Sequence, residues 1–361
     1  MRLLIVATNK TADNIHQQVK SGQHQRVDYL ELSERFAAEY VDYNRINSNR
    51  ITGWLAARLR IDFSQAVYVA RLVHTQGYDT VLSLSERVGI PLALCLNRQV
   101  KHIVIMHHPL SPKKLWLIKR LGLHQRWHKI IAISQAEAAV LRQTLGLGED
   151  RVLAVNTPVD TDFFAPYEEE APLRQRDHIQ SVGLSYRDYP TLINAMKLLP
   201  QIKCHLRVGS AWVQSDTGFS PDALPENVEI KPYVHPSLLK QCFAQSRFIV
   251  VPIRQTTQWS AGCTSVHLAQ AMGRAVITTN VPGLRDYVSE GETGLLVEPG
   301  NPVAMAEAID YLWRNPEKAA AMGRHGVEWI RSKFSIDTWL DQIELMLQLL
   351  LLLCYVIPMA L

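Results

Sequence analysis

Short runs of apolar residues alternate along the chain with segments whose apolar positions recur every three to four residues. The runs predict strands of a parallel sheet, because such strands are covered on both faces. The periodic segments predict amphipathic helices; one begins at Ser134, which with Glu137 resembles a capping box. In the first half we expect strands at Leu3–Ala7, Thr80–Leu84, His102–Met106, Lys129–Ile133 and Val152–Val155, with helical stretches at Ile51–Gln76 and Ser134–Leu145.

The second half repeats this alternation. Strand, helix, strand order is typical of βαβ units, so the fold class is α/β with two Rossmann-like parallel sheets. Ligands of open α/β sheets bind beyond the carboxyl ends of the strands, and we expect the two domains to face a cleft there. The predicted strands are Ile179–Val182, His205–Val208, Val228–Ile230, Phe248–Val251 and Ala275–Thr278, and the predicted helices are Thr191–Leu199, Ser237–Ala244 and Thr264–Met272.

The length of 361 residues favours two hydrophobic cores over one. A connector is expected at Asn156–Pro166 and the acidic run Glu168–Glu170. We therefore predict an N-terminal domain over residues 1–165, a second domain over 166–335 and a C-terminal helix or apolar tail over 336–361.

Composition narrows the function. Lysine and arginine outnumber acidic residues 38 to 34, so total charge gives no indication of nucleic-acid binding. The five cysteines are far apart, without the spacing of a zinc site or a disulfide scaffold, which favours a reducing cytoplasm. Met1–Ala7 is too short an apolar run for a signal peptide and predicts a strand.

The C-terminal segment Leu345–Leu361 has Gln348 as its one clearly polar side chain and contains five consecutive leucines. A helix that is apolar on all sides must be buried in something. Two interpretations stay open: a last helix buried between the domains or a poorly ordered tail, and a tail that inserts into a membrane, although about 20 apolar residues are needed to span one.

The segment Ser260–Ser265 lies between a predicted strand and a predicted helix and consists of small residues. Its backbone N–H groups, with the positive end of the helix dipole, would suit a phosphate or diphosphate, and Thr264 and Ser265 would add hydroxyl donors. The alternative is an ordinary helix cap.

The order of motifs in the second half resembles the donor-binding half of GT-B glycosyltransferases, in particular glycosyltransferase family 4 (group 1). The resemblance covers roughly residues 130–335 and is weak in the first 100 residues. It implies transfer of a sugar from a nucleotide-diphosphate sugar to a hydroxyl acceptor in a lipid, polysaccharide or glycoconjugate, with retention of configuration and without a metal or other cofactor. The segments that carry it are Asn156–Pro166, Ser181–Gly183, Arg187–Leu192, Ser260–Ile277, Pro282–Val288, Gly291–Val297 and Pro299–Pro302.

The resemblance also implies a donor site. Arg187 stands where the family usually has a lysine, and a guanidinium binds phosphate oxygens in pairs. Leu184 replaces an arginine that often follows the glycine. Both family glutamates are changed, the first to Gly262 and the second to Gln270, whose amide could still bind ribose hydroxyls. The expected donor-site residues are Gly183, Arg187, Tyr233, Gly262, Cys263, Thr264, Ser265 and Gln270.

In the first domain, the strand His102–Met106 is followed by His107 and His108. Related enzymes place a histidine here, facing the donor sugar, where an imidazole could bind a hydroxyl or assist proton transfer. We take these two as the catalytic candidates, with His107 favoured by position. Packing is the alternative, and a metal site is not expected because no carboxylates accompany the pair. Asp160–Asp162 looks like a metal-binding DxD motif but is interpreted as a turn in the connector.

Residues 112–129 carry six basic residues, no acidic ones and two tryptophans, Trp116 and Trp127. Such a segment suits an anionic membrane surface, so a peripheral membrane contact through 112–129 and 345–361 is one interpretation. A solvated basic helix is the other. The resemblance leaves two further functions open: a catalytically silent nucleotide-sugar binding protein and a sugar-nucleotide epimerase of the same fold, which predicts cleft carboxylates such as Asp286 and Glu292.

Overall fold

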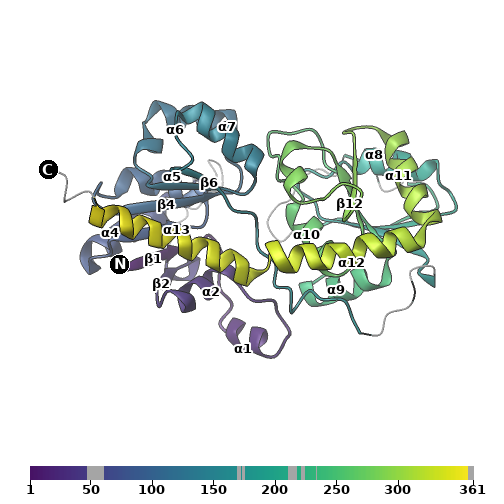
Figure 1. Ribbon diagram of the computed structural model, residues 1–361, viewed down its shortest axis with the longest axis horizontal. Helices are drawn as coiled ribbons and strands as arrows, with labels where there is room; N and C mark the ends of the chain where they lie inside the picture. Colours follow the sequence, from purple (N-terminus) through teal and green to yellow (C-terminus); the bar gives the residue numbers. More distant parts are fainter. Residues whose placement is uncertain are drawn as a thin grey trace. The chain divides into compact units, whose positions relative to one another are not determined.

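The computed structural model has two compact units, one formed by residues 1–20, 26–156 and 337–361 and the other by residues 21–25 and 157–336 (Figure 1). It describes residues 1–46, 61–168, 172, 175–209, 218–220, 224–232 and 234–356, with the side chains of the last helix up to 349. The segment 51–60 of the predicted stretch Ile51–Gln76, together with Tyr233 and the last five residues, lies outside these ranges.

The first unit contains a six-stranded, fully parallel sheet. In spatial order its strands are β2 (Glu39–Val41), β1 (Leu3–Val6), β3 (Thr80–Ser83), β4 (Lys101–Met106), β5 (Lys129–Ala132) and β6 (Val152–Ala154). The five predicted strands of this half are present. The edge strand β2 was not predicted, because a pattern of three residues is too short to indicate a strand. The helices are α1 (Ile15–Lys20), α2 (Asp28–Arg35), α4 (Phe63–Gln76), α5 (Glu86–Cys95), α6 (Pro112–Arg120), α7 (Gln135–Leu145) and α13 (Ile336–Val356).

Local sequence explains several helix ends in this unit. Ser134 accepts a hydrogen bond from the backbone N–H of Glu137, so the serine of the predicted capping box caps α7, and its hydroxyl donates to the Glu137 carboxylate. Gly146 ends α7 in the left-handed conformation that glycine tolerates best. Apolar side chains of β1, β3, α4 and α5 form one core cluster, which includes Leu4, Val6, Val69, Val81, Val88 and Leu92.

The second unit contains another six-stranded, fully parallel sheet. Its strands, in spatial order, are β12 (Gly294–Val297), β11 (Val276–Thr279), β10 (Ile249–Val251), β7 (His178–Val182), β8 (Lys203–Arg207) and β9 (Val228–Lys231). All five predicted strands are again present, and β12 is additional. The helices are α8 (Tyr189–Lys197), α9 (Pro236–Gln245), α10 (Cys263–Ala271), α11 (Pro302–Arg314) and α12 (Pro316–Lys333).

The boundaries of the units differ from those drawn from sequence. The first unit ends at Asn156 rather than 165, because the connector packs on the second unit: the backbone oxygen of Thr157 bonds His267 Nδ1 at 3.0 Å. Val159 likewise pairs with Ser335. The C-terminal helix is not a separate segment, because residues from 337 onward belong to the first unit.

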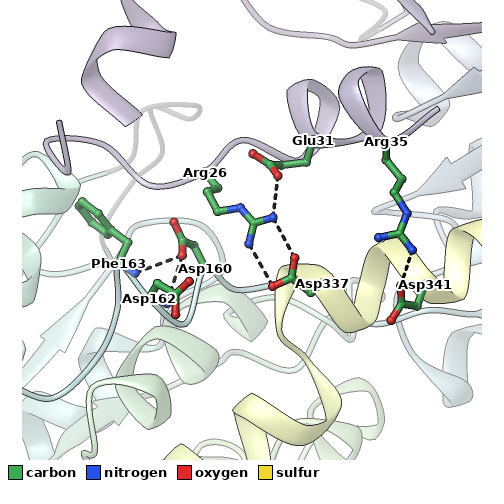
Figure 2. A network of polar contacts seen from close by, with 8 residues as sticks. All are labelled: Arg26, Glu31, Arg35, Asp160, Asp162, Phe163, Asp337 and Asp341. Carbon is green, nitrogen blue, oxygen red and sulfur yellow. Dashed lines mark hydrogen bonds and ion pairs between the residues drawn. The ribbon is translucent and has the colours of Figure 1, made fainter. Parts of the chain in front are cut away.

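The contacts of α13 with α2 explain this assignment. Arg26 bonds both Glu31 and Asp337, the latter through two nitrogens at 2.8 and 3.1 Å. Arg35 bonds Asp341 at 2.7 Å, and Figure 2 shows these pairs. On α13 the buried side chains are spaced as one helical face, namely Trp339, Leu340, Ile343, Met346 and Leu347.

The described part of α13 is therefore amphipathic and packs through its buried face. Leu345 and Leu349 are exposed on its other side. Within the described ranges, we find no helix with the length and apolarity required to cross a membrane. The predicted run Leu345–Leu361 continues beyond the described side chains.

Candidate functional site

The strand order of the second sheet locates its ligand-binding edge. β7 and β10 are neighbours, but the chain proceeds from β7 toward β8 on one side and from β10 toward β11 on the other. At such a switch point the loops beyond the carboxyl ends diverge and leave room for a ligand. Gly183 follows β7 directly, and the loop after β10 leads to Gly262 and α10. Two of the predicted donor motifs are thereby brought to one place.

Arg187 connects these two motifs. Its Nε donates to the backbone oxygen of Val182 at 2.8 Å, and its terminal nitrogens donate to Ser185 O at 3.1 Å and to the Ser265 hydroxyl at 2.8 Å. Val182 and Ser185 lie at the end of β7 and in the turn after it, whereas Ser265 lies in the first turn of α10. The guanidinium thus spans the switch point.

Both glycines make room for this guanidinium. A Cβ at Gly183 would lie 2.4 Å from a terminal nitrogen of Arg187, and a Cβ at Gly262 would lie 3.2 Å from the other. Both residues also have positive φ, +105° and +87°, where any other L-residue is strained. Glycine is required here by space as well as by backbone conformation.

Among the described residues, no acidic side chain neutralises the charge of Arg187. The side chain is 4% exposed, and burial lowers the pKa of its guanidinium. Within the described ranges, Arg187 forms no ion pair, and all its hydrogen bonds go to neutral oxygens. An uncompensated buried cation is costly, and a bound anion would offset that cost.

The start of α10 adds neutral donors beside this cation. Gly262 provides no side-chain cap, and Thr264 is exposed. In the described part of the chain, the backbone N–H groups of Thr264 and Ser265 have no hydrogen-bond acceptor. Unpaired N–H groups at a helix N-terminus favour an anion. Cationic side chain, free amides and helix dipole therefore all select for negative charge.

The other predicted residues of this site have different surroundings. Gln270 is fully buried, and its amide nitrogen donates to Tyr287 O at 3.1 Å and to the Thr293 hydroxyl at 3.0 Å. The side chain of Gln270 therefore bonds other parts of the second unit and is not exposed at the surface, where a ribose hydroxyl could reach it. Cys263 is also buried, 3.7 Å from the Thr157 hydroxyl. Tyr233 lies outside the described residues.

One basic residue of this site was missed by sequence reasoning. Arg254 follows β10, its backbone N–H bonds Tyr186 O at 3.0 Å, and its Nε donates to Arg187 O at 2.8 Å. Arg254 therefore lies beside the turn after β7 that contains Arg187. In that turn, Leu184 stands where the family often has an arginine after the glycine. The only sequence signal was a basic residue just past a buried strand, which is common and unspecific.

The histidine candidates belong to the first unit. His107 follows β4 and is exposed, with its ring Nε2 3.0 Å from the backbone oxygen of Leu84. His108 is half-buried. Glu86 contacts the backbone of His107, and the sequence analysis did not single out this carboxylate.

Two features bear on metal binding. In the residues that the structure describes, no group of three or more His, Cys, Asp or Glu side chains is arranged to hold an ion. Asp160 accepts from the backbone N–H groups of Asp162 at 3.2 Å and Phe163 at 3.1 Å (Figure 2). Asp160 therefore caps a turn in the connector, as the sequence predicted.

Comparison with solved structures defines the class. Sucrose-phosphate synthase from Thermosynechococcus elongatus has a TM-score of 0.76 at 18% identity, covering 97% of this chain and 99% of that chain. Anabaena Alr3699/HepE in complex with UDP and glucose has a TM-score of 0.70 at 16% identity, covering 96% and 99%. With its two parallel six-stranded sheets, this protein has the GT-B fold.

Family models extend this likeness to sequence. Residues 183–315 match the family described as "Glycosyl transferases group 1", and residues 12–163 match "Glycosyltransferase Family 4". The chain belongs to the group 1, family 4 glycosyltransferases. The second match includes the N-terminal region in which the sequence analysis found little pattern.

Curated relatives carry similar names. A D-inositol 3-phosphate glycosyltransferase of Segniliparus rotundus is 25% identical over 68% of this chain and 58% of its own length. One from Streptomyces scabiei is 25% identical over 81% and 73%. The capsular polysaccharide biosynthesis glycosyltransferase CapM of Staphylococcus aureus is 40% identical over 22% and 20%. The chain thus spans little more than half the length of the first of these relatives.

Proposed function

We propose that this protein transfers a sugar from a nucleotide-diphosphate sugar to a hydroxyl acceptor in a lipid, polysaccharide or glycoconjugate. The observation that carries the proposal is the buried Arg187 guanidinium, which pairs with no carboxylate in the described part of the chain and lies beside two N–H groups at the start of α10 that have no acceptor there. The solved complexes of Alr3699/HepE with UDP and with UDP-glucose support this donor class.

Charge stabilisation is the chemical role of the site in this proposal. The bond between the anomeric carbon and the diphosphate oxygen breaks, and the acceptor oxygen bonds the anomeric carbon. The acceptor proton passes to the departing diphosphate. Arg187, the N–H groups of Thr264 and Ser265 and the helix dipole stabilise the negative charge that develops on the leaving group. These donors do so without a metal in the proposed reaction.

His107 is the proposed contact to the donor sugar. Because a carbonyl only accepts hydrogen bonds, its Nε2 carries the proton that is donated to Leu84 O. The neutral ring then has Nδ1 as an acceptor for a sugar hydroxyl. Retention of configuration is proposed from family membership, and NMR of the anomeric proton in the first-formed product tests it.

Titration calorimetry with UDP-, GDP- and dTDP-linked sugars tests the donor site. Arg187→Met removes the charge but keeps most of the side-chain volume, and we expect donor affinity to fall about 10- to 100-fold, the effect of losing a charge-assisted pair. Arg274→Met is the matched control, because Arg274 is equally buried at the other end of α10 and donates to Phe243 O.

The outcomes separate the alternatives. Unchanged affinity in Arg187→Met would remove Arg187 from the site, and binding of none of the donors would refute the proposal. Donor binding with neither hydrolysis nor transfer to any acceptor would favour the silent nucleotide-sugar binding protein. Conversion of the sugar at one carbon without transfer would favour the epimerase.

We also propose a peripheral membrane contact through α6. Trp116 is 66% exposed, and Lys113, Lys119 and Arg120 are exposed at positions along the same side of the helix. The predicted patch is smaller than 112–129, because Trp127 and Lys129 are buried. An exposed aromatic residue among cations suits an anionic interface.

Vesicle sedimentation tests this contact. The protein should bind vesicles with 30% phosphatidylserine more than neutral phosphatidylcholine vesicles, as about 1 kcal/mol per basic residue predicts. Trp116→Ala should weaken that binding, whereas Trp313→Ala, in the second unit, should not. Equal binding to both vesicle types would refute the contact.

A further inference from the structure

We infer that Glu86 is a positioning residue that fixes the backbone and the ring tautomer of His107. The inference rests on the proposed function for the role of His107 in the reaction. The arrangement itself is defined by contacts within the first unit alone.

Glu86 lies where a strand passes into a helix. Ser85 caps α5 by accepting from the backbone N–H of Arg87, and Glu86 is the first residue of that helix, beyond the carboxyl end of β3. β4 is the neighbouring strand, and His107 follows it. Neighbouring parallel strands therefore bring Glu86 and His107 to the same edge of the sheet.

Both carboxylate oxygens of Glu86 are used by other elements. Oε2 accepts from the backbone N–H of His107 at 3.0 Å, and Oε1 accepts from Lys114 Nζ at 2.6 Å. Glu86 is 4% exposed. Burial alone would raise the pKa of this carboxyl, but the charge of Lys114, the charge that His107 carries when it is protonated, and the hydrogen bonds from both residues bring it to about 2. It therefore acts as a charged acceptor.

The same segment also holds the imidazole. Leu84, two residues before Glu86, accepts from Nε2 of His107 at 3.0 Å. The backbone N–H and the ring of His107 are thus bonded to one three-residue stretch, 84–86. This pair of bonds selects the Nε2–H tautomer and leaves Nδ1 as the acceptor nitrogen.

A helix-capping role does not account for these contacts. Glu137 is a useful comparison, because it is also buried in the first turn of a helix that is capped by a serine and follows a strand of the same sheet, β5. Its hydrogen bonds with Ser134 lie at the start of its own helix. Glu86 instead joins the β4 loop to α6.

Substitution by glutamine exploits this difference. An amide has one acceptor oxygen, and the ammonium group of Lys114 competes for it more strongly than a backbone N–H. In Glu86→Gln the backbone N–H of His107 then faces the NH₂ group of the glutamine, and two hydrogen-bond donors cannot bond each other. We expect the β4 loop to shift and the bond from Nε2 to Leu84 to weaken, so that both tautomers are populated.

The experiment combines a spectroscopic and a kinetic measurement on the full chain. Long-range ¹H–¹⁵N spectra of ¹⁵N-histidine protein, with His107 assigned by His107→Gln, should show the Nε2–H form in the wild type above neutral pH. Glu86→Gln should show both forms. With a donor that binds the wild type, kcat should fall about 10- to 100-fold while the donor KM changes less than about threefold, as misplacement of a reacting group predicts.

Glu137→Gln is the matched control and should change neither the spectrum nor kcat. If Glu86→Gln does not fold, Glu86→Asp, which is too short to make both contacts, is measured in its place. An unchanged His107 spectrum in the folded variant overturns the inference. Because the spectrum needs no substrate, it decides on Glu86 even if no donor binds and the proposed function fails.

Discussion

At the residue scale, the surroundings of a buried polar side chain show whether the protein itself satisfies that group or whether a ligand could do so. Arg274 and Asn227 are satisfied by backbone oxygens, and Asn227 donates to three of them. Arg187 also donates to neutral oxygens, but it bonds the first turn of α10, where the N–H groups of Thr264 and Ser265 have no acceptor among the described residues. Those neighbouring donors, rather than the presence of a buried arginine, distinguish the proposed anion site from the position of Arg274.

A second buried group predicts a pH dependence of stability. His267 is fully buried, packs against the rings of Tyr287 and Phe334, and donates to Thr157 O; burial lowers its pKa to about 3. The unfolded chain binds this proton near pH 6.5. Its contribution is therefore complete above pH 6.5 and is lost as the pH falls toward 3, by up to about 1.4 kcal/mol per pH unit.

Urea unfolding at several pH values between 7 and 4 measures this effect. His267→Phe keeps an aromatic ring in the stack and should make the unfolding free energy of the second unit less dependent on pH. His325→Phe, at an exposed position of the same unit, should leave the dependence unchanged. Equal slopes in wild type and His267→Phe would contradict the assignment.

At the element scale, α13 shows how a segment's partners decide its role. The run of leucines from 349 to 353 predicts a helix that is apolar on all sides. Between 336 and 349, however, the helix has acidic residues on one side and buried apolar side chains on the other. The ion pairs with Arg26 and Arg35 are partly exposed, so solvent screens them and they contribute little to stability. The apolar face therefore supplies most of the attachment to the first unit.

Alanine substitutions on the two sides of α13 test this. Ile343 is fully buried, so Ile343→Ala should lower the unfolding free energy of the first unit by about 2–5 kcal/mol. Leu345, two residues on, is 59% exposed, and Leu345→Ala should change it by less than about 0.5 kcal/mol. Similar effects for both variants, measured by urea unfolding, would mean that α13 is not packed as described.

At the scale of the whole molecule, each unit has its own sheet and core, so a ligand of one unit should stabilise that unit first. UDP at about 100 times its Kd would add about 2.7 kcal/mol to the unit that binds it. We expect slower amide hydrogen exchange at Thr264, Ser265 and the turn after β7. Protection confined to the first unit would place the donor site elsewhere.

Much of the fold could be predicted because its signals are local. All ten expected strands are present, since buried parallel strands are continuous apolar runs. β2 and β12 were missed: Glu39–Val41 has three residues, and Gly294 begins the other strand with a glycine, which weakens a strand pattern. The predicted unit boundary differed because it depends on which unit the connector packs against.

The candidate site likewise combines local features, which the sequence predicts, with contacts between distant residues, which it does not. The glycine turns and the helix start at 262–265 are local features that the sequence by itself determined, as it did both parallel sheets, because backbone conformation and burial periodicity depend on near neighbours. Only the tertiary structure decided that Arg187 meets Ser265, that Gln270 is enclosed and that Glu86 holds His107. Those contacts join residues that follow different strands, and the strand order that brings them together is set by packing of the whole sheet.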